Sequence, residues 1–435
     1  TGSGGKVMRE LLMNARLICP LQNIDANGWL LIENGIIADS GNGSADSSIT
    51  ADKITDCKGQ IIGPSFVDMR VQSGYPGAEH LETMDSLLQS AASGGISTVV
   101  LLPSTLPVID NAAIIDSLQV RADRANGPKV HCYGAMTKGL KQDQMAELGL
   151  MAKAGAVGFA SGTMSIQSAL SMYRIMTYAA MLDKPIIHHC EDFSLSENGD
   201  MNEGETSTRL GLLGKPALAE TLVLERDVQL AEATGVHYHA SHISTAGAVE
   251  IIRQAKQRGL KITADTAPPY FTMNEFAVSG YDTRMKMNPP LRCEEDREAI
   301  VDGLSDGTID AVASDHIPVN PDMKNQPFTL ASCGGPGLET VMQMTAKLVH
   351  GGQLSWKRAF ELLSTGPARI LKLDSGSLKT GKPADLVQID PNAACVIDAQ
   401  TFKCLSRISP FDGQPCEGKV NRLWIDGISC LPDTS

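Results

Sequence analysis

The sequence predicts an α/β protein in which a (β/α)8 TIM-like barrel carries a small β-sandwich domain assembled from both ends of the chain. Two observations lead to this prediction. Short apolar runs separated by turn residues fill residues 8–62 and 376–435, whereas in residues 63–375 short continuous apolar runs alternate with amphipathic helical stretches. Residues 1–7 are rich in glycine and precede Met8, so we interpret them as an artificial extension before the natural start.

The two ends are predicted to share one domain because neither has enough apolar surface for a core of its own. The clearest strands of the tail are residues 384–389 and 420–425, and the amino-terminal part offers short runs such as 29–32 and 61–62. Packing these strands together also keeps the termini close, as is common in domains.

The middle of the chain is predicted to form parallel strands buried on both faces, since such strands are continuously apolar. Helical patterns over residues 206–234 and 244–257 lie between these runs. The predicted strands are residues 96–102, 130–133, 156–159, 185–188, 236–239, 261–264 and 309–313.

The composition of the 435 residues excludes some functions. The net charge of −13 and an aromatic content of 4% argue against nucleic-acid binding, which uses basic and aromatic surfaces. No apolar run is long enough for a membrane span, so no membrane association is expected. The 10 cysteines form no Cys-x-x-Cys pair, and we expect reduced thiols in a cytoplasmic protein.

Several predicted strands end in residues that can bind metal or transfer protons. His188 and His189, His239 and His242, Asp265, and Asp315 with His316 all follow apolar runs. The carboxyl ends of barrel strands converge at one mouth, where barrel enzymes carry their active sites. We therefore expect a functional site there, with His188 directed away from His189 because neighbouring strand residues face opposite sides.

The motifs around these positions resemble those of the type I dihydroorotases of the cyclic amidohydrolase superfamily. The resemblance runs from about Gly35 to Gly427. The matching segments are Gly63-Pro64-Ser65-Phe66-Val67-Asp68, His189-Cys190-Glu191-Asp192, Ser241-His242-Ile243-Ser244, Asn288-Pro289-Pro290-Leu291-Arg292, Ser314-Asp315-His316 and Gly337-Leu338-Glu339-Thr340.

The resemblance implies metal-assisted hydrolysis, or closure, of a cyclic amide in pyrimidine biosynthesis. A zinc-bound water supplies the nucleophile in this chemistry, and a carboxylate moves the proton. Carried over to this chain, Asp315 is the catalytic carboxylate and a metal ligand, His189 and His242 are further metal ligands, and Asn288 binds substrate.

Other positions depart from the family pattern. The family's His-x-His metal pair is replaced by Arg70-Val71-Gln72, and a guanidinium cannot ligate zinc. Gly74 and Ser104 replace a substrate-binding Arg and Asn, and Val319 replaces a later His. The bridging Lys or Asp has no counterpart near 158–162.

These departures leave three hypotheses. The first is a degenerate dihydroorotase that, like the inactive members it resembles, is a structural partner of aspartate transcarbamoylase. In that case Arg70 fills the metal space and pairs with Asp315. The second is an altered cyclic amidohydrolase with one zinc ion on His189, His242 and Asp315, in which Arg70 clamps the substrate. The third is an active dihydroorotase that recruits ligands from Gln72, Glu79 or His80. We also expect a homo-oligomer.

Overall fold

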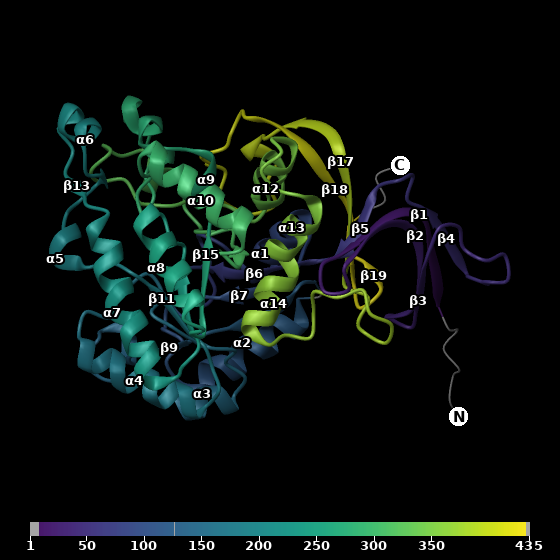
Figure 1. Ribbon diagram of the computed structural model, residues 1–435, viewed down its shortest axis with the longest axis horizontal. Helices are drawn as coiled ribbons and strands as arrows, with labels where there is room; N and C mark the ends of the chain where they lie inside the picture. The colour runs from purple at the N-terminus through teal and green to yellow at the C-terminus, as the bar shows by residue number, and fades with distance from the viewer. Residues whose placement is uncertain (1–7, 126, 432–435) are drawn as a thin grey trace.

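The computed structural model describes residues 8–125 and 127–431 and shows a barrel of parallel strands beside a curved sheet (Figure 1). The predicted artificial extension, residues 1–7, lies outside the described residues, as do residue 126 and the last four residues of the predicted composite domain.

The barrel contains eight strands, counted over the described residues and with β8 and β9 taken as one interrupted strand. An isolated parallel bridge between Val71 and His316 joins the first strand to the segment after the last one. The predicted barrel is therefore confirmed. Its strands are β6 (Phe66–Val71), β7 (Ile96–Leu101), β8 (Lys129–Cys132), β9 (Gly134–Ala135), β10 (Phe159–Ala160), β11 (Ile186–His189), β14 (Tyr238–Ser241), β15 (Ile262–Thr266) and β16 (Ala311–Val312).

Helices follow the strands and cover the outside of the barrel, as Figure 1 shows for α4, α7 and α8. The helices are α1 (Met84–Ser93), α2 (Ala112–Arg124), α3 (Leu148–Lys153), α4 (Ala169–Met181), α5 (Phe193–Ser196), α6 (Glu205–Leu210), α7 (Leu218–Thr234), α8 (Ala246–Gln257), α9 (Pro268–Thr272), α10 (Glu294–Asp306), α11 (Pro321–Lys324), α12 (Val341–His350), α13 (Trp356–Phe360) and α14 (Gly366–Leu371). A π-helical turn, Glu361–Thr365, joins α13 to α14.

Burial on both faces explains why the barrel strands are continuously apolar. In β7, Val99 and Leu101 pack in the core between strands and helices, whereas Val100 and the following Leu102 pack inside the barrel. The same alternation in β11 places Ile187 inside and Ile186 outside. His189 therefore faces the interior side and His188 the helices.

The single helix predicted over residues 206–234 is wrong. α6 ends at Leu210 because Gly211 takes a left-handed conformation (φ 67°) and its N–H bonds back to the helix. The chain then runs through Gly214 and Lys215, which form β13 beside β12 (Met201–Asn202), before α7 begins. Pro216, two residues before α7, also disfavours helical continuation. This insertion stands above the barrel mouth and brings Lys215 to the site.

The two ends of the chain join in one eight-stranded sheet of order β19-β18-β17-β5-β1-β2-β3, with β4 paired to β1. The predicted composite domain is thus confirmed, and its strands pair in one continuous sheet around a shared core. Its strands are β1 (Arg9–Cys19), β2 (Ile24–Glu33), β3 (Ile36–Asn42), β4 (Lys53–Asp56), β5 (Ile61–Pro64), β17 (Leu386–Val396), β18 (Pro415–Ile425) and β19 (Ile428–Ser429).

The sheet is held by a core that draws on both ends of the chain. Leu12, Leu30 and Ile62 from the amino-terminal part pack with Leu386 and Trp424 from the tail. None of the helices in the described residues has the length and apolar composition needed to cross a membrane.

Candidate active site

The predicted site residues come together at the carboxyl ends of the barrel strands. Arg70 lies near the end of β6, His189 ends β11, His242 follows β14, and Asp315 lies three residues after β16. The barrel topology brings together residues that are up to 245 positions apart in the sequence.

The centre of the site is a continuous row of hydrogen bonds. Arg70 Nε donates to Asp315 Oδ1 at 2.8 Å, and Arg70 Nη1 donates to the Ser241 hydroxyl at 3.1 Å. The other oxygen of Asp315 lies 3.1 Å from His242 Nδ1, and His242 Nε2 lies 2.8 Å from His189 Nδ1. The ion pair expected between Arg70 and Asp315 is therefore present.

The row continues outward to Asn288. His189 Nε2 lies 2.8 Å from Glu191 Oε2. The Lys215 ammonium donates to Glu191 Oε1 and to Asn288 Oδ1, both at 2.7 Å. Asn288 thus sits in the site, where its amide oxygen is bound to a protein cation.

Asp265 holds the main chain of His242 in place. Its carboxylate accepts the main-chain N–H of His242 at 2.5 Å and lies 2.9 Å from His239 Nε2. Both His242 and Asp315 have positive φ angles, 40° and 50°. Such conformations cost energy in non-glycine residues and persist where surrounding contacts enforce them.

The charges in the row fix the protonation of its members. Burial alone would raise the pKa of Asp315, but His242 and the Arg70 guanidinium outweigh it and hold that pKa well below its usual range. Burial opposes the ionisation of Glu191 as well, and His189 and Lys215 lower the pKa of Glu191 in the same way. Burial and the Arg70 charge lower the pKa of His242 to about 4, so its imidazole is neutral at neutral pH.

This donor set does not fit a zinc ion. Both oxygens of Asp315 and both ring nitrogens of His242 already have protein partners. The Arg70 charge also compensates Asp315, and that of Lys215 compensates Glu191. A divalent cation would add positive charge beside a fixed guanidinium.

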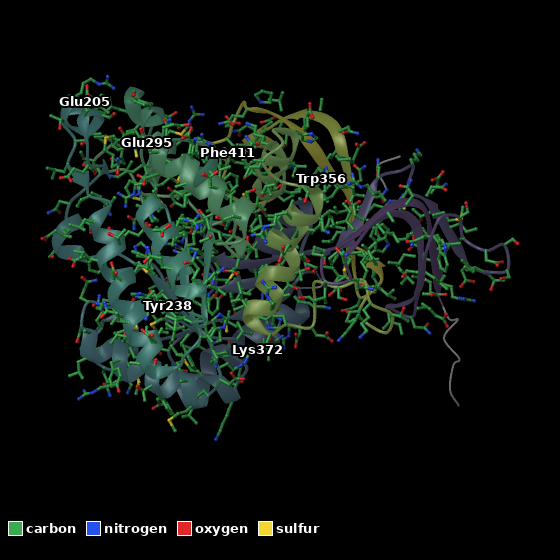
Figure 2. The ribbon with its side chains drawn as sticks, in the orientation of Figure 1. Glu205, Tyr238, Glu295, Trp356, Lys372 and Phe411 are labelled. Atoms are coloured by element: carbon green, nitrogen blue, oxygen red, sulfur yellow. The ribbon has the colours of Figure 1, made fainter. Side chains whose placement is uncertain are left out.

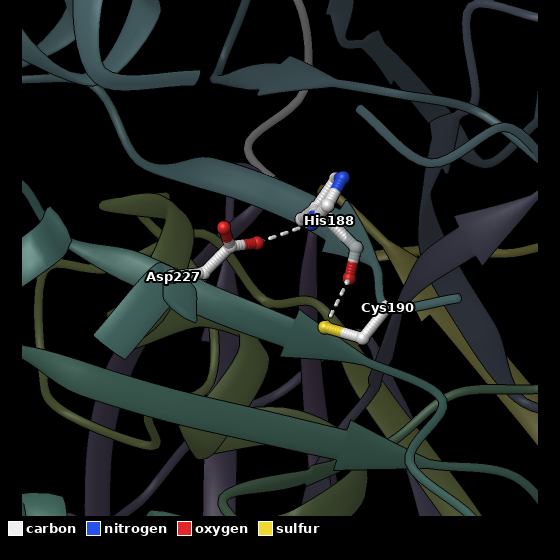
Figure 3. A group of neighbouring side chains, drawn as sticks. All are labelled: His188, Cys190 and Asp227. Atoms are coloured by element: carbon white, nitrogen blue, oxygen red, sulfur yellow. Dashed lines mark hydrogen bonds and ion pairs between the residues drawn. The ribbon is translucent and has the colours of Figure 1, made fainter. Parts of the chain in front are cut away.

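The one group of three potential ligand atoms that lie within 4.8 Å of one another, among the described residues, is His188, Cys190 and Asp227 (Figure 3). His188 Nδ1 pairs with Asp227 at 2.7 Å, and Nε2 accepts the N–H of Ile166 at 2.9 Å. Burial raises the pKa of Cys190 well above its usual value, so the thiol keeps its proton, whereas zinc needs the thiolate. We interpret this cluster as a structural link between β11 and α7.

Little space remains beside Asp315 and His189, whereas a cavity of about 450 Å³ borders Glu191 and Lys215 at the outer end of the row. The cavity beside Asp315 and Asn288 has a volume of about 10 Å³, and so does the cavity beside His189 and Glu191. Each is about the size that holds one water molecule. Sites for small-molecule ligands typically measure about 300–1,000 Å³.

The substituted family positions lie around the same mouth. A Cβ at Gly74 would lie only 2.4 Å from the carbonyl oxygen of Glu82 and 2.6 Å from that of Ala78, so the turn admits no side chain. The Ser104 hydroxyl is buried and has no hydrogen-bond partner among the described residues. Val319 is buried, and the main-chain N–H of Gln72 donates to the carbonyl of His316 at 2.9 Å.

The alternative ligands considered for an active enzyme do not join the row. Glu79 and His80 are exposed, and the Glu79 carboxylate accepts the N–H of Gly77 at 3.0 Å within its own loop. His316, adjacent to Asp315, is turned to the buried Glu82, whose carboxylate lies 2.6 Å from its Nε2.

Two side chains that bond to the residues of the row were not predicted from the sequence. Lys215 lies on a two-residue strand inside the insertion after β11, where no periodicity identifies it. Ser241 immediately precedes His242 at the end of β14, and a serine at a strand end is too common to signal a contact with Arg70.

Solved structures of similar fold define the class of protein. The L-hydantoinase (dihydropyrimidinase) from Arthrobacter aurescens matches with a TM-score of 0.86 and 25% identity over 98% of this chain and 96% of the other. A D-hydantoinase matches with a TM-score of 0.83 and 20% identity over the same shares of the two chains, which shows the fold alone. The chain is thus a barrel of the cyclic amidohydrolase class.

Sequence relatives define the family more narrowly. The family described as dihydro-orotase-like matches residues 59–248. The dihydroorotase of Syntrophotalea carbinolica is 43% identical over 97% of this chain and 98% of its own. That of Anaplasma phagocytophilum is 39% identical over 95% and 93%. The chain belongs to the dihydroorotase family.

Proposed function

We propose that this chain is a catalytically degenerate member of the dihydroorotase family that serves pyrimidine biosynthesis as a structural partner of aspartate transcarbamoylase. The observation that carries the loss of activity is the buried ion pair between Arg70 and Asp315. It places a permanent cation on the carboxylate that would otherwise bind metal and move the proton.

The surroundings of the ion pair support the same proposal. The two cavities that border Asp315 and His189 measure about 10 Å³ each, too small for dihydroorotate or carbamoyl aspartate, and the cavity of about 450 Å³ beside Glu191 and Lys215 is not lined by Asp315 or His242. The turn at Gly74 excludes an arginine side chain at the position that would hold the substrate carboxylate. The proposed partner rests on the resemblance to inactive family members.

Metal analysis with an activity assay tests the loss of function. The purified chain is expected to contain far less than one zinc ion per chain and to turn over neither dihydroorotate nor carbamoyl aspartate. The dihydroorotase of Syntrophotalea carbinolica, purified and assayed in parallel, serves as the positive control. Turnover at the control's rate would overturn the proposal.

The same measurement separates the second candidate, a cyclic amidohydrolase with one zinc ion. The observation in its favour is that three side chains able to bind zinc, His189, His242 and Asp315, lie next to one another at the mouth, although their bonds to one another and to Arg70 would have to break. One zinc ion per chain without dihydroorotase turnover would support this candidate. Zinc binding would then require Arg70 to release Asp315.

Size-exclusion chromatography with aspartate transcarbamoylase from the same organism tests the partner. The two chains are expected to elute together at a mass above that of either alone. The mass of this chain alone tests the proposed homo-oligomer. Separate elution of the two proteins at concentrations well above those in the cell would remove this partner from the proposal.

A further inference from the structure

A larger cavity lies at the opposite end of the barrel from the candidate active site. It measures about 470 Å³, within the range of small-molecule sites. It is bordered by the residues that precede β11, β14 and β15 and by the end of α14. Lys372, at that end, and Tyr238, the first residue of β14, are labelled in Figure 2.

The register of the strands gathers basic residues at this end. Ile186, Tyr238 and Ile262 are direct partners in neighbouring parallel strands. Lys184, two residues before Ile186, and His237 and Lys261, one residue before Tyr238 and Ile262, therefore border one end of the barrel. From this end, each of these strands rises about 3.3 Å per residue toward the mouth that holds the candidate active site.

The cavity carries an excess of positive charge in an acidic protein. Four side chains that line it are cations, Lys184, Lys261, Arg369 and Lys372, against one carboxylate, Asp183. Lys372 pairs with that carboxylate, and Arg369 lies 3.9 Å from Glu361 and 4.0 Å from Asp310. Lys184 and Lys261 have no ion pair within the part of the chain that the structure describes.

The neighbouring cations act on one another. Burial and the Lys372 charge lower the pKa of Lys184. Burial, His239 and the lysines lower the pKa of His237 to about 4, which leaves its ring neutral. An anion in the cavity would relieve this repulsion and receive charge-assisted hydrogen bonds.

We propose that this cavity binds a small phosphorylated anion. Several cations around one cavity fit a ligand group that carries two or more negative charges better than they fit a single carboxylate. The side chains of Val236, Leu260, Ile262 and Ile370 also line the cavity and provide an apolar wall for an organic group attached to the phosphate. The overall charge of −13 repels long polyanions, which favours a small ligand.

Calorimetric titration with inorganic pyrophosphate and with adenosine diphosphate at physiological ionic strength tests this site. Saturable binding of at least one probe is expected, at one molecule per chain. Tighter binding of the nucleotide would identify an organic phosphate, and equal or weaker binding an inorganic one; either outcome supports the site. Removing two charge-assisted contacts in a Lys184→Met/Lys261→Met variant should weaken binding by about tenfold or more.

A Lys379→Met variant provides the matched control, because Lys379 is exposed in the segment between α14 and β17, outside this cavity. It is expected to bind like the unmodified chain, and the thermal unfolding of both variants without ligand checks that they fold. The proposal is overturned if neither probe binds saturably, or if the folded double variant binds as tightly as the control.

Discussion

Arg70 changes what Asp315 can do chemically. A general base must accept a proton near the working pH. Asp315 instead has a pKa well below its usual range, and both of its oxygens are engaged by Arg70 and His242. At neutral pH this carboxylate is a fixed anion that compensates a buried guanidinium.

The substitution Arg70→Met tests the energetic role of the ion pair. The side chains of Arg70 and Asp315 are 2% and 10% exposed, and removing one partner of a buried pair costs about 3–5 kcal/mol. Denaturant unfolding should therefore show that the free energy of unfolding of the Arg70→Met variant is about 3 kcal/mol lower than that of the unmodified chain. As a control, Arg258→Met removes an exposed pair with Glu232 and should change stability by about 0.5 kcal/mol or less. Equal losses of unfolding free energy in the two variants would contradict a stabilising role of the buried ion pair.

The lowered pKa of His242 predicts a pH dependence. Its folded value is about 4 and its unfolded value 6.5, so the unfolded chain binds the extra proton first as the pH falls. The stability associated with a neutral His242 is full above pH 6.5 and is lost as the pH falls toward 4, in total about 3 kcal/mol.

Two measurements check this pH dependence. The NMR signals of the His242 ring should titrate near pH 4. The difference in unfolding free energy between the unmodified chain and a His242→Gln variant should shrink over the same interval. A ring that titrates near 6.5 would contradict the predicted environment.

At the scale of elements, the turn between β6 and α1 is packed against its own backbone at Gly74. A Gly74→Ala variant places a Cβ 2.4 Å from a carbonyl oxygen, and overpacking of this kind costs about 1–3 kcal/mol. The expected result is a lower unfolding temperature in calorimetry. Gly280→Ala is the matched control, because a Cβ there meets nothing within 4 Å, and it should unfold like the original chain.

The barrel strands and most of the site could be predicted from the sequence because both follow local rules. Apolar runs buried on both faces mark the strands, and polar residues at their ends mark the mouth. The break between α6 and α7 was missed although Gly211, Gly214 and Pro216, residue types that end helices, mark it in the sequence. Lys215 was missed because its place depends on the folded insertion.

The hydrogen-bond network that links the site residues to one another could not be predicted from the sequence. The pattern identifies His189, His242 and Asp315 as possible ligands, but only the fold shows that their atoms bond to one another and to Arg70 and Glu191. The distances that decide between a ligand set and a closed network depend on side-chain conformation.

At the scale of the whole molecule, the tail completes the sheet that the amino-terminal part begins. β17 pairs with both β18 and β5, and Leu386 and Trp424 fill the core of the sheet. A chain that ends at Ser375 should therefore expose this core and lose its cooperative unfolding transition. A chain that ends at Leu431 keeps these strands and should unfold in circular dichroism like the full protein. A soluble, cooperatively folded short chain would contradict this view.

The two ends of the barrel have different electrostatic character although they share strands. β11 and β14 lead from the basic cavity to His189 and His242 at the mouth, where cations and carboxylates are paired. An anion bound in the basic cavity would not contact the site residues at the mouth. Binding there can therefore be measured independently of the proposed loss of catalysis.

The packed turn at Gly74 has a consequence for the history of the protein. A single mutation to arginine there would meet the main chain before it could reach a substrate. Replacing Arg70 alone would leave Asp315 without its counter-ion in a buried place. Under the proposed loss of catalysis, each single substitution toward the family residues would therefore lower stability before it restored the site, so one mutation at a time would not easily reverse the loss.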